Sequence, residues 1–441
     1  MTLPPQLPLR SEFLLPTNNE VGANRLPNES DQPCTYLCGN SLGLMSKRSK
    51  ELVEEEMSVW ATRGVIGHFD HPHKRGWVGL ADHARPYLAE IVGAKEHEVV
   101  CMSTLTTNLH LMMDSFYKPT PERYKILCEA KAFPSDQYAF ASQAQLHGLD
   151  PAKAVLELSP RPGEFSLREE DILEVIQRDG HSIAVVIFSG VQYYTGQWFP
   201  MQFITQKAKE QGCICGWDLA HAVGNVPLSL HEWDVDFAVW CTYKYLNSGP
   251  GGIAGLYVHE KWNDSLKPKY AGWWGHDPLT RFAMPPKFSP INGAGGFQQS
   301  NPSILAIASL LGSLQTFKKA GMMVALRKRS IELTNHLERL LFQSKHFVHL
   351  KDMSTRDQGK PGFTIITPHD PKDRGAQLSL LFLPTGTGVM QKIFELLQSY
   401  GVIGDERQPD VIRLAPVHLY SNEADCEAAA KFLDIAFDEL V

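Results

Sequence analysis

The chain has 441 residues, of which 43% are hydrophobic and 21% charged, and its formal net charge is −7. These values are ordinary for a globular protein of two or three domains with a sizeable core. The acidic balance and the lack of any basic run argue against a nucleic-acid partner. The apolar runs are too short to span a bilayer, so we expect no membrane insertion.

The cysteines and the first residues bear on cellular location. The eight cysteines are scattered along the chain, which favours reduced thiols in a cytoplasmic protein. Cys213 and Cys215 lie on the same face of one predicted strand and are expected in the core. The stretch MTLPPQLPLRSEF has neither a signal-peptide core nor the pattern of an Arg-rich targeting helix, so we expect no export.

Short apolar runs alternate with amphipathic segments from residue 98 onward. Before them, 1–45 is irregular, and 46–63 and about 78–93 are predicted helices. The predicted strands are 98–102, 124–129, 154–158, 183–188, 213–217, 237–241 and 253–258, and helices are predicted at about 106–117, 135–147, 168–179 and 201–211. This alternation predicts an α/β fold whose largely parallel sheet has helices on both faces.

The last third of the chain predicts a second, smaller α/β domain. A helix that starts at Pro302 leads into another at about 322–345, and 346–441 has the pattern strand, strand, strand, helix, strand, helix. We therefore expect a large domain at 46–320 and a small C-terminal domain at 321–441, with 1–45 packing against the small domain.

Lys244 ends a predicted buried strand, and a glycine cluster follows directly in the stretch 241–255. An α/β protein places its chemistry at this edge of the sheet. A partly desolvated amine there can attack a carbonyl and form a Schiff base. The alternative is an ordinary surface lysine at a strand end.

Asp218 closes the preceding apolar strand, so its carboxylate would stand at the same edge. A buried carboxylate needs a cationic or proton-donating partner, and a pyridinium nitrogen would serve. Capping of a following helix is the alternative. The functional interpretation is favoured because Tyr243 and Lys244 follow one strand later.

Weaker candidates lie at other strand ends. The hydroxyls of 103–108 precede a helix and suit a phosphate, with plain N-capping as the alternative. Phe133 would present a ring able to stack on a flat heterocycle, unless it is a core residue. Arg413, inside an aliphatic strand, would face a carboxylate, either that of a substrate or that of an internal salt bridge.

His68, His71 and His73 lack the spacing of a strong zinc signature, so we expect no metal and favour contact of a histidine with a polar aromatic substrate. The chain has no P-loop, no G-x-S-x-G, no HExxH and no G-x-G-x-x-G after a strand. A serine hydrolase, a zinc protease and a Rossmann dehydrogenase are therefore poorly supported.

Nine sequence blocks together resemble one family, in its order, from about residue 35 to 420. They are LCGNSLG at 37–43, LTTNLH at 105–110, FPSD at 133–136, FSGVQYYTGQ at 188–197, DLAHAVGN at 218–225, CTYKYLN at 241–247, GWWGH at 272–276, QSNP at 299–302 and RLAP at 413–416. The family is that of the kynureninases, fold-type I pyridoxal-phosphate enzymes of the class V aminotransferase kind.

The resemblance implies a fold-type I transferase fold whose large domain has a mainly parallel seven-stranded sheet. It implies pyridoxal 5′-phosphate as cofactor and hydrolytic Cβ–Cγ cleavage of L-kynurenine or 3-hydroxykynurenine. The products would be L-alanine and anthranilate or its 3-hydroxy form, in tryptophan catabolism and NAD biosynthesis. It also implies a homodimer with shared active sites.

The resemblance further implies residue roles. Lys244 would hold the cofactor covalently, Asp218 would pair with its pyridinium nitrogen, and Tyr243 would assist the reaction as a donor. The remaining cofactor residues would be Leu105, Thr106, Phe133, Pro134, Ser135, Asp136, Ser189, His221, Trp273 and Asn301. Arg413 would take the substrate carboxylate, His68 and Asn301 would lie near its aryl end, and Ser41 would also contact the substrate.

The rival enzyme activities are those of a cysteine desulfurase or an aminotransferase, and a non-catalytic scaffold is the rival from another class. No cysteine lies in an evident Gly/Ser-rich active loop, and a scaffold would be expected to lack Lys244 or Asp218. Two further expectations concern loops and clefts. The Gly-rich segment 291–302 should not pack as core but reach a partner's site. If the partner of Arg413 is the substrate carboxylate, Arg413 should stand in a water-filled cleft.

Overall fold

The structure, a computed structural model, describes residues 8–353 and 359–440. By contacts the chain divides into two units. The large unit consists of Arg48–Gly190 and Phe199–Gln315, and the small unit of Met1–Lys47, Val191–Trp198 and Thr316–Val441. The predicted limits of independent domains, at 45/46 and 320/321, stay a prediction.

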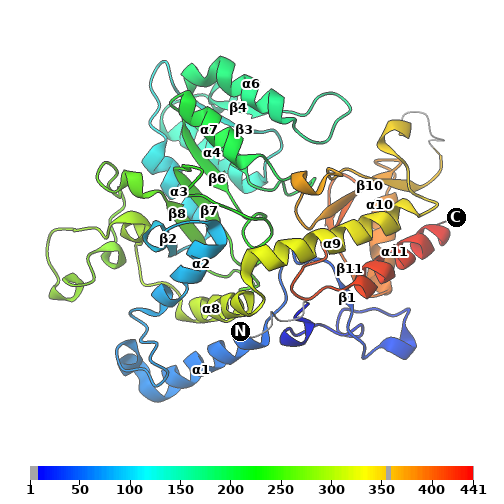
Figure 1. Cartoon of the computed structure of the whole chain (residues 1–441), viewed down its shortest axis with the longest axis horizontal. Coiled ribbons are helices and arrows are strands. Elements are labelled where there is room, and N and C mark those ends of the chain that lie inside the picture. The colour runs from blue at the N-terminus through cyan, green and yellow to red at the C-terminus, as the bar shows by residue number, and fades with distance from the viewer. Residues whose placement is uncertain (1–7, 354–358, 441) are drawn as a thin grey trace. The chain divides into compact units, whose positions relative to one another are not determined.

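The large unit is built on a seven-stranded sheet of order β2-β8-β7-β6-β5-β3-β4 (Figure 1). Only β8 runs antiparallel to its neighbours β2 and β7, so the predicted mainly parallel sheet is confirmed. Its strands are β2 (Val99–Cys101), β3 (Lys125–Glu129), β4 (Val155–Leu158), β5 (Ile183–Ser189), β6 (Ile214–Asp218), β7 (Phe237–Trp240) and β8 (Gly255–Val258).

The four helices predicted between these strands are present as α3 (Leu105–Phe116), α4 (Pro134–Leu146), α6 (Glu169–Asp179) and α7 (Met201–Glu210). A short helix that was not predicted, α5 (Pro151–Ala154), precedes β4. Outside the strands lie α1 (Lys47–Arg63), α2 (Arg85–Val92) and α8 (Ile304–Lys319). The single helix expected at 78–93 is instead a 3-10 turn, Leu80–His83, followed by α2. Pro86 explains the break, because proline has no amide hydrogen and favours the first turn of a helix.

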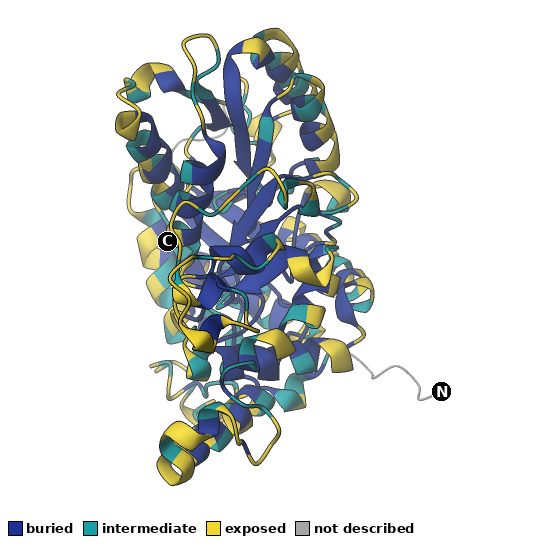
Figure 2. Ribbon diagram, turned by 90° about the vertical axis from the view of Figure 1, so that its left-hand side faces the viewer, coloured by how far each residue is buried: buried dark blue, intermediate teal, exposed yellow. Residues whose placement is uncertain are grey.

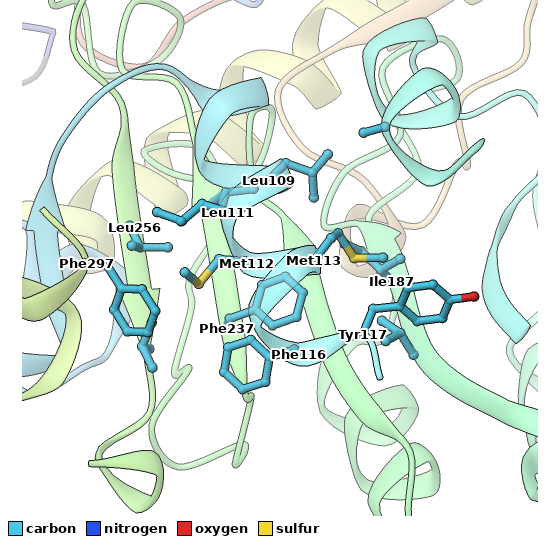
Figure 3. Packing of buried hydrophobic residues seen from close by; sticks show 14 of the residues in the cluster. Leu109, Leu111, Met112, Met113, Phe116, Tyr117, Ile187, Phe237, Leu256 and Phe297 are labelled. Carbon is cyan, nitrogen blue, oxygen red and sulfur yellow. The ribbon is translucent and has the colours of Figure 1, made fainter. Parts of the chain in front are cut away.

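Helix α3 shows how the core fixes this sheet. Its apolar residues recur at helical spacing, and Leu109, Met112 and Phe116 face the strands, where the ring of Phe116 stacks on Phe237 at 4.9 Å (Figure 3). Every strand except the edge strand β4 is almost wholly buried, and the helices expose their outer faces (Figure 2). Burial on both faces explains why these strands read as continuous apolar runs.

The small unit contains a four-stranded antiparallel sheet of order β12-β13-β10-β9. The strands are β9 (Gly362–Ile365), β10 (Leu378–Leu383), β12 (Asp405–Arg407) and β13 (Val411–Leu414), and the helices are α9 (Met322–Phe342), α10 (Val389–Ser399) and α11 (Glu423–Asp438). The N-terminal segment adds β1 (Thr35–Tyr36), which pairs in parallel with β11 (Val402–Ile403). The segment Val191–Trp198 belongs to this unit because its carbonyls accept hydrogen bonds from Gln377 and Ser379.

The order of elements predicted for 346–441 was wrong. The structure has two strands, then α10, then β11, β12 and β13, and finally α11. The apolar run that begins at Phe347 makes only an isolated bridge to Phe363, while β12 reads Asp-Glu-Arg and has no apolar pattern to reveal it. The segment 354–358 lies outside the described residues. In the described parts of the chain, no helix combines the length and the apolar character needed to cross a membrane.

Candidate active site

The carboxyl ends of β7, β6, β5 and β3 meet at one edge of the large unit's sheet. Asp218, Ser189 and Glu129 are the last residues of their strands, and Lys244 follows the end of β7. Ser189 and Asp218 lie directly opposite each other across the β5–β6 pair. The predicted position of Lys244 and Asp218 at a common sheet edge is therefore confirmed.

Hydrogen bonds of the Thr242 side chain hold the loop that carries Lys244. This buried hydroxyl donates to the Ile253 carbonyl at 2.5 Å and accepts from the Ser248 hydroxyl at 2.6 Å. Asn247, with φ of 51°, donates its backbone N–H to the Lys244 carbonyl at 3.0 Å. The turn is thus held at both ends, which fixes the point from which the lysine side chain starts.

The Lys244 amine lies against a histidine and an aromatic ring. Its Nζ is 2.9 Å from Nε2 of His221 and 5.9 Å from the ring centroid of Phe133. Phe133 is the N-cap residue of α4 and is 42% exposed, so the alternative that it is a core phenylalanine was wrong. An open aromatic face therefore stands beside the amine, as stacking on a flat ligand requires.

Asp218 is buried, and its Oδ1 accepts the Ala220 N–H at 2.7 Å in a local turn and not at the start of a helix. It also shares a side-chain hydrogen bond with Asp136, in the first turn of α4. Burial raises the pKa of Asp218, and burial together with the Asp218 charge raises that of Asp136 well above its usual range. Asp136 therefore keeps its proton and donates it to Asp218.

The first turn of α3 presents backbone N–H groups that could receive an anion. Its N-cap residue Thr104 makes no side-chain capping bond, and its hydroxyl instead contacts that of Thr107 at 2.9 Å. The alternative, that a hydroxyl of this stretch caps the helix N-terminus, is therefore wrong for Thr104. Leu105 and Thr106 begin the helix and are half-buried, and the N–H groups of a first turn have no partners within the helix.

Of the other predicted residues in the large unit, Tyr243 precedes Lys244, is half-buried, and has a pKa raised by burial. Trp273 is 47% exposed and donates to the Arg281 carbonyl at 3.1 Å. His68 donates from Nδ1 to the Val65 carbonyl at 3.1 Å. The side chain of Tyr243 is hydrogen-bonded to Cys241, so none of these three side chains is shown in contact with the Lys244 amine.

Two histidines of the same loop have different surroundings. The ring of His68 meets Trp77 edge-on at 5.2 Å and is partly accessible. His71 is buried, with Nε2 2.8 Å from a carboxylate oxygen of Glu56, which also accepts from Trp77 and Arg75. His71 thus ties the loop to Glu56, whereas His68 is bonded only within the loop at Nδ1 and is partly accessible.

The expectation that 291–302 does not pack as core was wrong. Ala294 and Phe297 are 0% and 3% exposed and belong to the main core cluster, next to Leu256 of β8. One aromatic side chain is enough to bury this Gly-rich turn, because its glycines allow the backbone to approach closely. Its end, Gln299 to Asn301, is exposed, as is Asn292 near its start.

Arg413 does not stand in the water-filled cleft that was expected if its partner is the substrate carboxylate. Its side chain is 1% exposed, forms an ion pair with Asp405 on the neighbouring strand, and donates from Nη1 to the Tyr193 carbonyl at 2.7 Å. Burial lowers the pKa of Arg413, which the Asp405 charge opposes. The internal salt bridge that the sequence left open is therefore present. Ser41, also in the small unit, is half-buried.

Sequence reasoning missed Glu129. It ends β3 with 3% exposure, and its Oε1 accepts the Ser189 hydroxyl at 2.5 Å. Burial, with a contribution from the Asp218 charge, raises the pKa of Glu129 to about 7. The available signal was an acidic residue that closes a buried strand four residues before Phe133.

Solved structures with the same fold define the class. A C-DES mutant with glycine covalently linked to its PLP cofactor has a TM-score of 0.74 at 18% identity, covering 93% of this chain and 97% of that chain. The apo cysteine desulfurase of Thermococcus onnurineus NA1 has a TM-score of 0.71 at 16% identity, covering 97% and 100%. The fold is therefore that of the class V aminotransferase-like, fold-type I enzymes.

Sequence comparison narrows the class to a family. The model for the kynureninase C-terminal domain matches residues 326–433. The kynureninase of Yarrowia lipolytica is 51% identical over 92% of this chain and 94% of its own length, and that of Nematostella vectensis is 49% identical over 97% and 90%. The kynureninase of Saccharomyces cerevisiae is 47% identical over 98% and 97%. The chain belongs to the kynureninase family.

The residues at the sheet edge fit pyridoxal 5′-phosphate. The buried Asp218 carboxylate, with a neutral acid beside it, is an acceptor suited to a protonated ring nitrogen. The exposed face of Phe133 can stack on the ring, and the first turn of α3 can receive the phosphate. The Lys244 amine, next to His221 and Phe133, could form the covalent link.

Proposed function

We propose that the chain is a pyridoxal-phosphate-dependent hydrolase. It cleaves the Cβ–Cγ bond of L-kynurenine or 3-hydroxykynurenine, and consumes water to release L-alanine and anthranilate or 3-hydroxyanthranilate. The observation that carries the proposal is the Lys244 amine, 2.9 Å from His221 at the strand edge that holds buried Asp218, in a chain 51% identical to a kynureninase. Tryptophan catabolism and NAD biosynthesis are the pathways in which this reaction belongs.

The side chains divide the work of proton handling. Bound pyridoxal phosphate supplies a covalent link to the amino acid and a ring that withdraws electrons from the bonds around Cα. Lys244 removes and returns protons at the substrate carbons, and His221, in contact with its amine, can take up or release the proton. Asp218 holds a proton on the ring nitrogen. Tyr243 keeps its own proton at neutral pH and can donate a hydrogen bond to oxygen at Cγ.

The direct test adds pyridoxal phosphate to the apoprotein, follows its visible absorption, and then measures anthranilate fluorescence after addition of L-kynurenine. Lys244→Ala should lose both the protein-linked absorption band and all turnover. Lys153→Ala, which removes a 79% exposed lysine of the same unit, is the matched control and should behave like the wild type. Retained absorption and activity in Lys244→Ala would remove that residue from its role.

A desulfurase activity on the same fold is less well supported. A desulfurase attacks with an accessible thiolate. In this chain every cysteine except Cys38 is buried, and burial raises the pKa of Cys38 to about 12. Release of sulfide from L-cysteine at a rate comparable to anthranilate formation would favour the desulfurase activity over the proposed hydrolase activity.

Arg413 is proposed as the site of the substrate carboxylate, with His68 and Asn301 near the aryl end and Ser41 also in contact. What supports Arg413 is its geometry. Asp405 holds one end of the guanidinium, while Nε has no hydrogen-bond partner among the described residues. A buried arginine with one orienting carboxylate and an unsatisfied Nε–H donor is suited to pair with a second carboxylate.

The functional unit is proposed to be a homodimer with shared active sites. Exposed apolar residues gather where α1 ends, at Trp60, Val65, Ile66 and Phe69, which are 65%, 76%, 55% and 70% exposed. The ring of Phe69 packs on Phe282 at 5.6 Å. Exposed apolar surface of this extent favours an interface with a second copy of the chain. Light scattering that shows a fully active monomer would refute the dimer.

A cytoplasmic location is also proposed. Its support is the state of the cysteines, all eight of which are free thiols in the structure. Fractionation of cells that express the untagged protein tests it, since recovery in a secreted or organelle fraction would contradict the proposal.

A further inference from the structure

Glu129 is a buried carboxyl group of the sheet edge to which the proposed chemistry gives no task. It is 3% exposed, and both of its oxygens lie 3.3 Å from the Ser189 backbone N–H. Its Oε1 also accepts the Ser189 hydroxyl proton at 2.5 Å. Two hydrogen bonds from a single residue of the next strand therefore hold this carboxylate.

The bond to Glu129 decides what the Ser189 hydroxyl can offer a ligand. A serine hydroxyl has one proton to donate and two lone pairs that accept. Because the proton is given to Glu129, the oxygen that remains can only accept a hydrogen bond. A neutral partner in place of the carboxylate would allow the hydroxyl to turn and donate instead.

We propose that Glu129 is a positioning residue of the cofactor site, which fixes the Ser189 hydroxyl as a hydrogen-bond acceptor toward the bound cofactor. Ser189 stands directly opposite Asp218 in the strand register, so its oxygen belongs to the same side of the site as the ring-nitrogen partner. The inference rests on the proposed function and adds a residue to it, one that acts on the cofactor through Ser189.

The charges around Glu129 make this arrangement sensitive to pH. Asp218 on β6 and Asp136 on α4 are the acidic groups that face Glu129. The positive charge of Lys244 lowers the pKa of both aspartates. With its pKa raised to about 7 by burial, Glu129 is largely ionised above neutrality and protonated below it. The hydroxyl of Ser189 is therefore oriented best on the alkaline side.

The test measures the dissociation constant of pyridoxal phosphate from the apoprotein of four variants. Glu129→Gln should weaken binding at least about tenfold, since a charge-assisted hydrogen bond is lost. Ser189→Ala should weaken it as well, and the double variant should bind no worse than Ser189→Ala alone, because Glu129 acts through the hydroxyl. Glu157→Gln is the matched control, an exposed glutamate on the neighbouring strand β4, and should bind like the wild type.

Binding of Glu129→Gln within twofold of wild type, or losses that multiply in the double variant, would overturn the inference. If Glu129→Gln fails to fold, Ser189→Ala still tests the contact. Loss of the hydroxyl should raise the Glu129 pKa, and so move the pH-dependent fall in apoprotein melting temperature to higher pH. An unchanged profile would overturn the inference. Failure of the wild type to bind pyridoxal phosphate would instead count against the proposed function.

Discussion

The pair formed by Asp136 and Asp218 makes the stability of the apoprotein depend on pH. The Asp136 pKa is raised in the folded state, so at pH values above about 4, the ordinary range of aspartate, the unfolded chain releases a proton that the folded chain retains. Stability therefore falls as pH rises toward the folded pKa. We expect melting temperature to fall less between pH 5 and 7 in Asp136→Asn than in the wild type. A steeper fall in the variant would contradict the shared proton.

Arg413 offers a test that separates a structural role from a substrate role. Arg413→Lys keeps the positive charge but loses the planar guanidinium that binds a carboxylate through two hydrogen bonds. If Arg413 binds the substrate carboxylate, KM for kynurenine should therefore rise at least about tenfold. Because the side chain is paired with Asp405, melting temperature should fall as well. Asp405→Asn is the companion variant, and it should also raise KM because Asp405 orients the guanidinium. Unchanged KM in both variants, with lower stability, would assign Arg413 to the fold alone.

At the scale of elements, the turn after β7 owes its shape to Thr242. In Thr242→Val the partners Ser248 and Ile253 lose their bonds within a buried turn, which should cost about 1–3 kcal/mol of the free energy of unfolding. Affinity for pyridoxal phosphate should fall too, since the turn positions Lys244. Thr242→Ser keeps the hydroxyl and serves as the control. Denaturant unfolding and cofactor titration measure both effects. Wild-type stability and affinity in the valine variant would show that the turn does not depend on the Thr242 hydroxyl.

The elements also show which parts of the site can be predicted from sequence. Strand ends could be located from apolar runs, which was enough to place Asp218 and Lys244 at one edge. The partner of Arg413 could not be predicted. Asp405 lies opposite Arg413 only because β12 and β13 pair in an antiparallel register, and β12 has no apolar pattern that would reveal it as a strand. The burial of Phe297 was missed for a similar reason, since composition suggested an exposed turn and a tertiary contact decided otherwise.

At the scale of the whole molecule, shared sites in a homodimer predict complementation. We expect Lys244→Ala and Asn301→Ala to be individually impaired, with the lysine and the exposed asparagine of each site coming from different copies. Unfolding and refolding an equal mixture would form mixed dimers with one intact site, and so restore up to about a quarter of wild-type activity. No recovery despite proven exchange of copies would place both residues in the same copy's site.

The order of the strand-end residues along the chain has a consequence for biosynthesis. Glu129, Asp136 and Asp218 are all translated before Lys244, although they end up beside one another. A nascent chain that has folded β3, β5 and β6 but lacks β7 must therefore bury several acids without the lysine that balances them. Such a partial sheet tolerates burial only if the acids keep their protons. Fragments that stop before residue 237 should accordingly be more compact at mildly acidic pH than at neutral pH, and the emergence of Lys244 completes the charge balance that allows the edge to close.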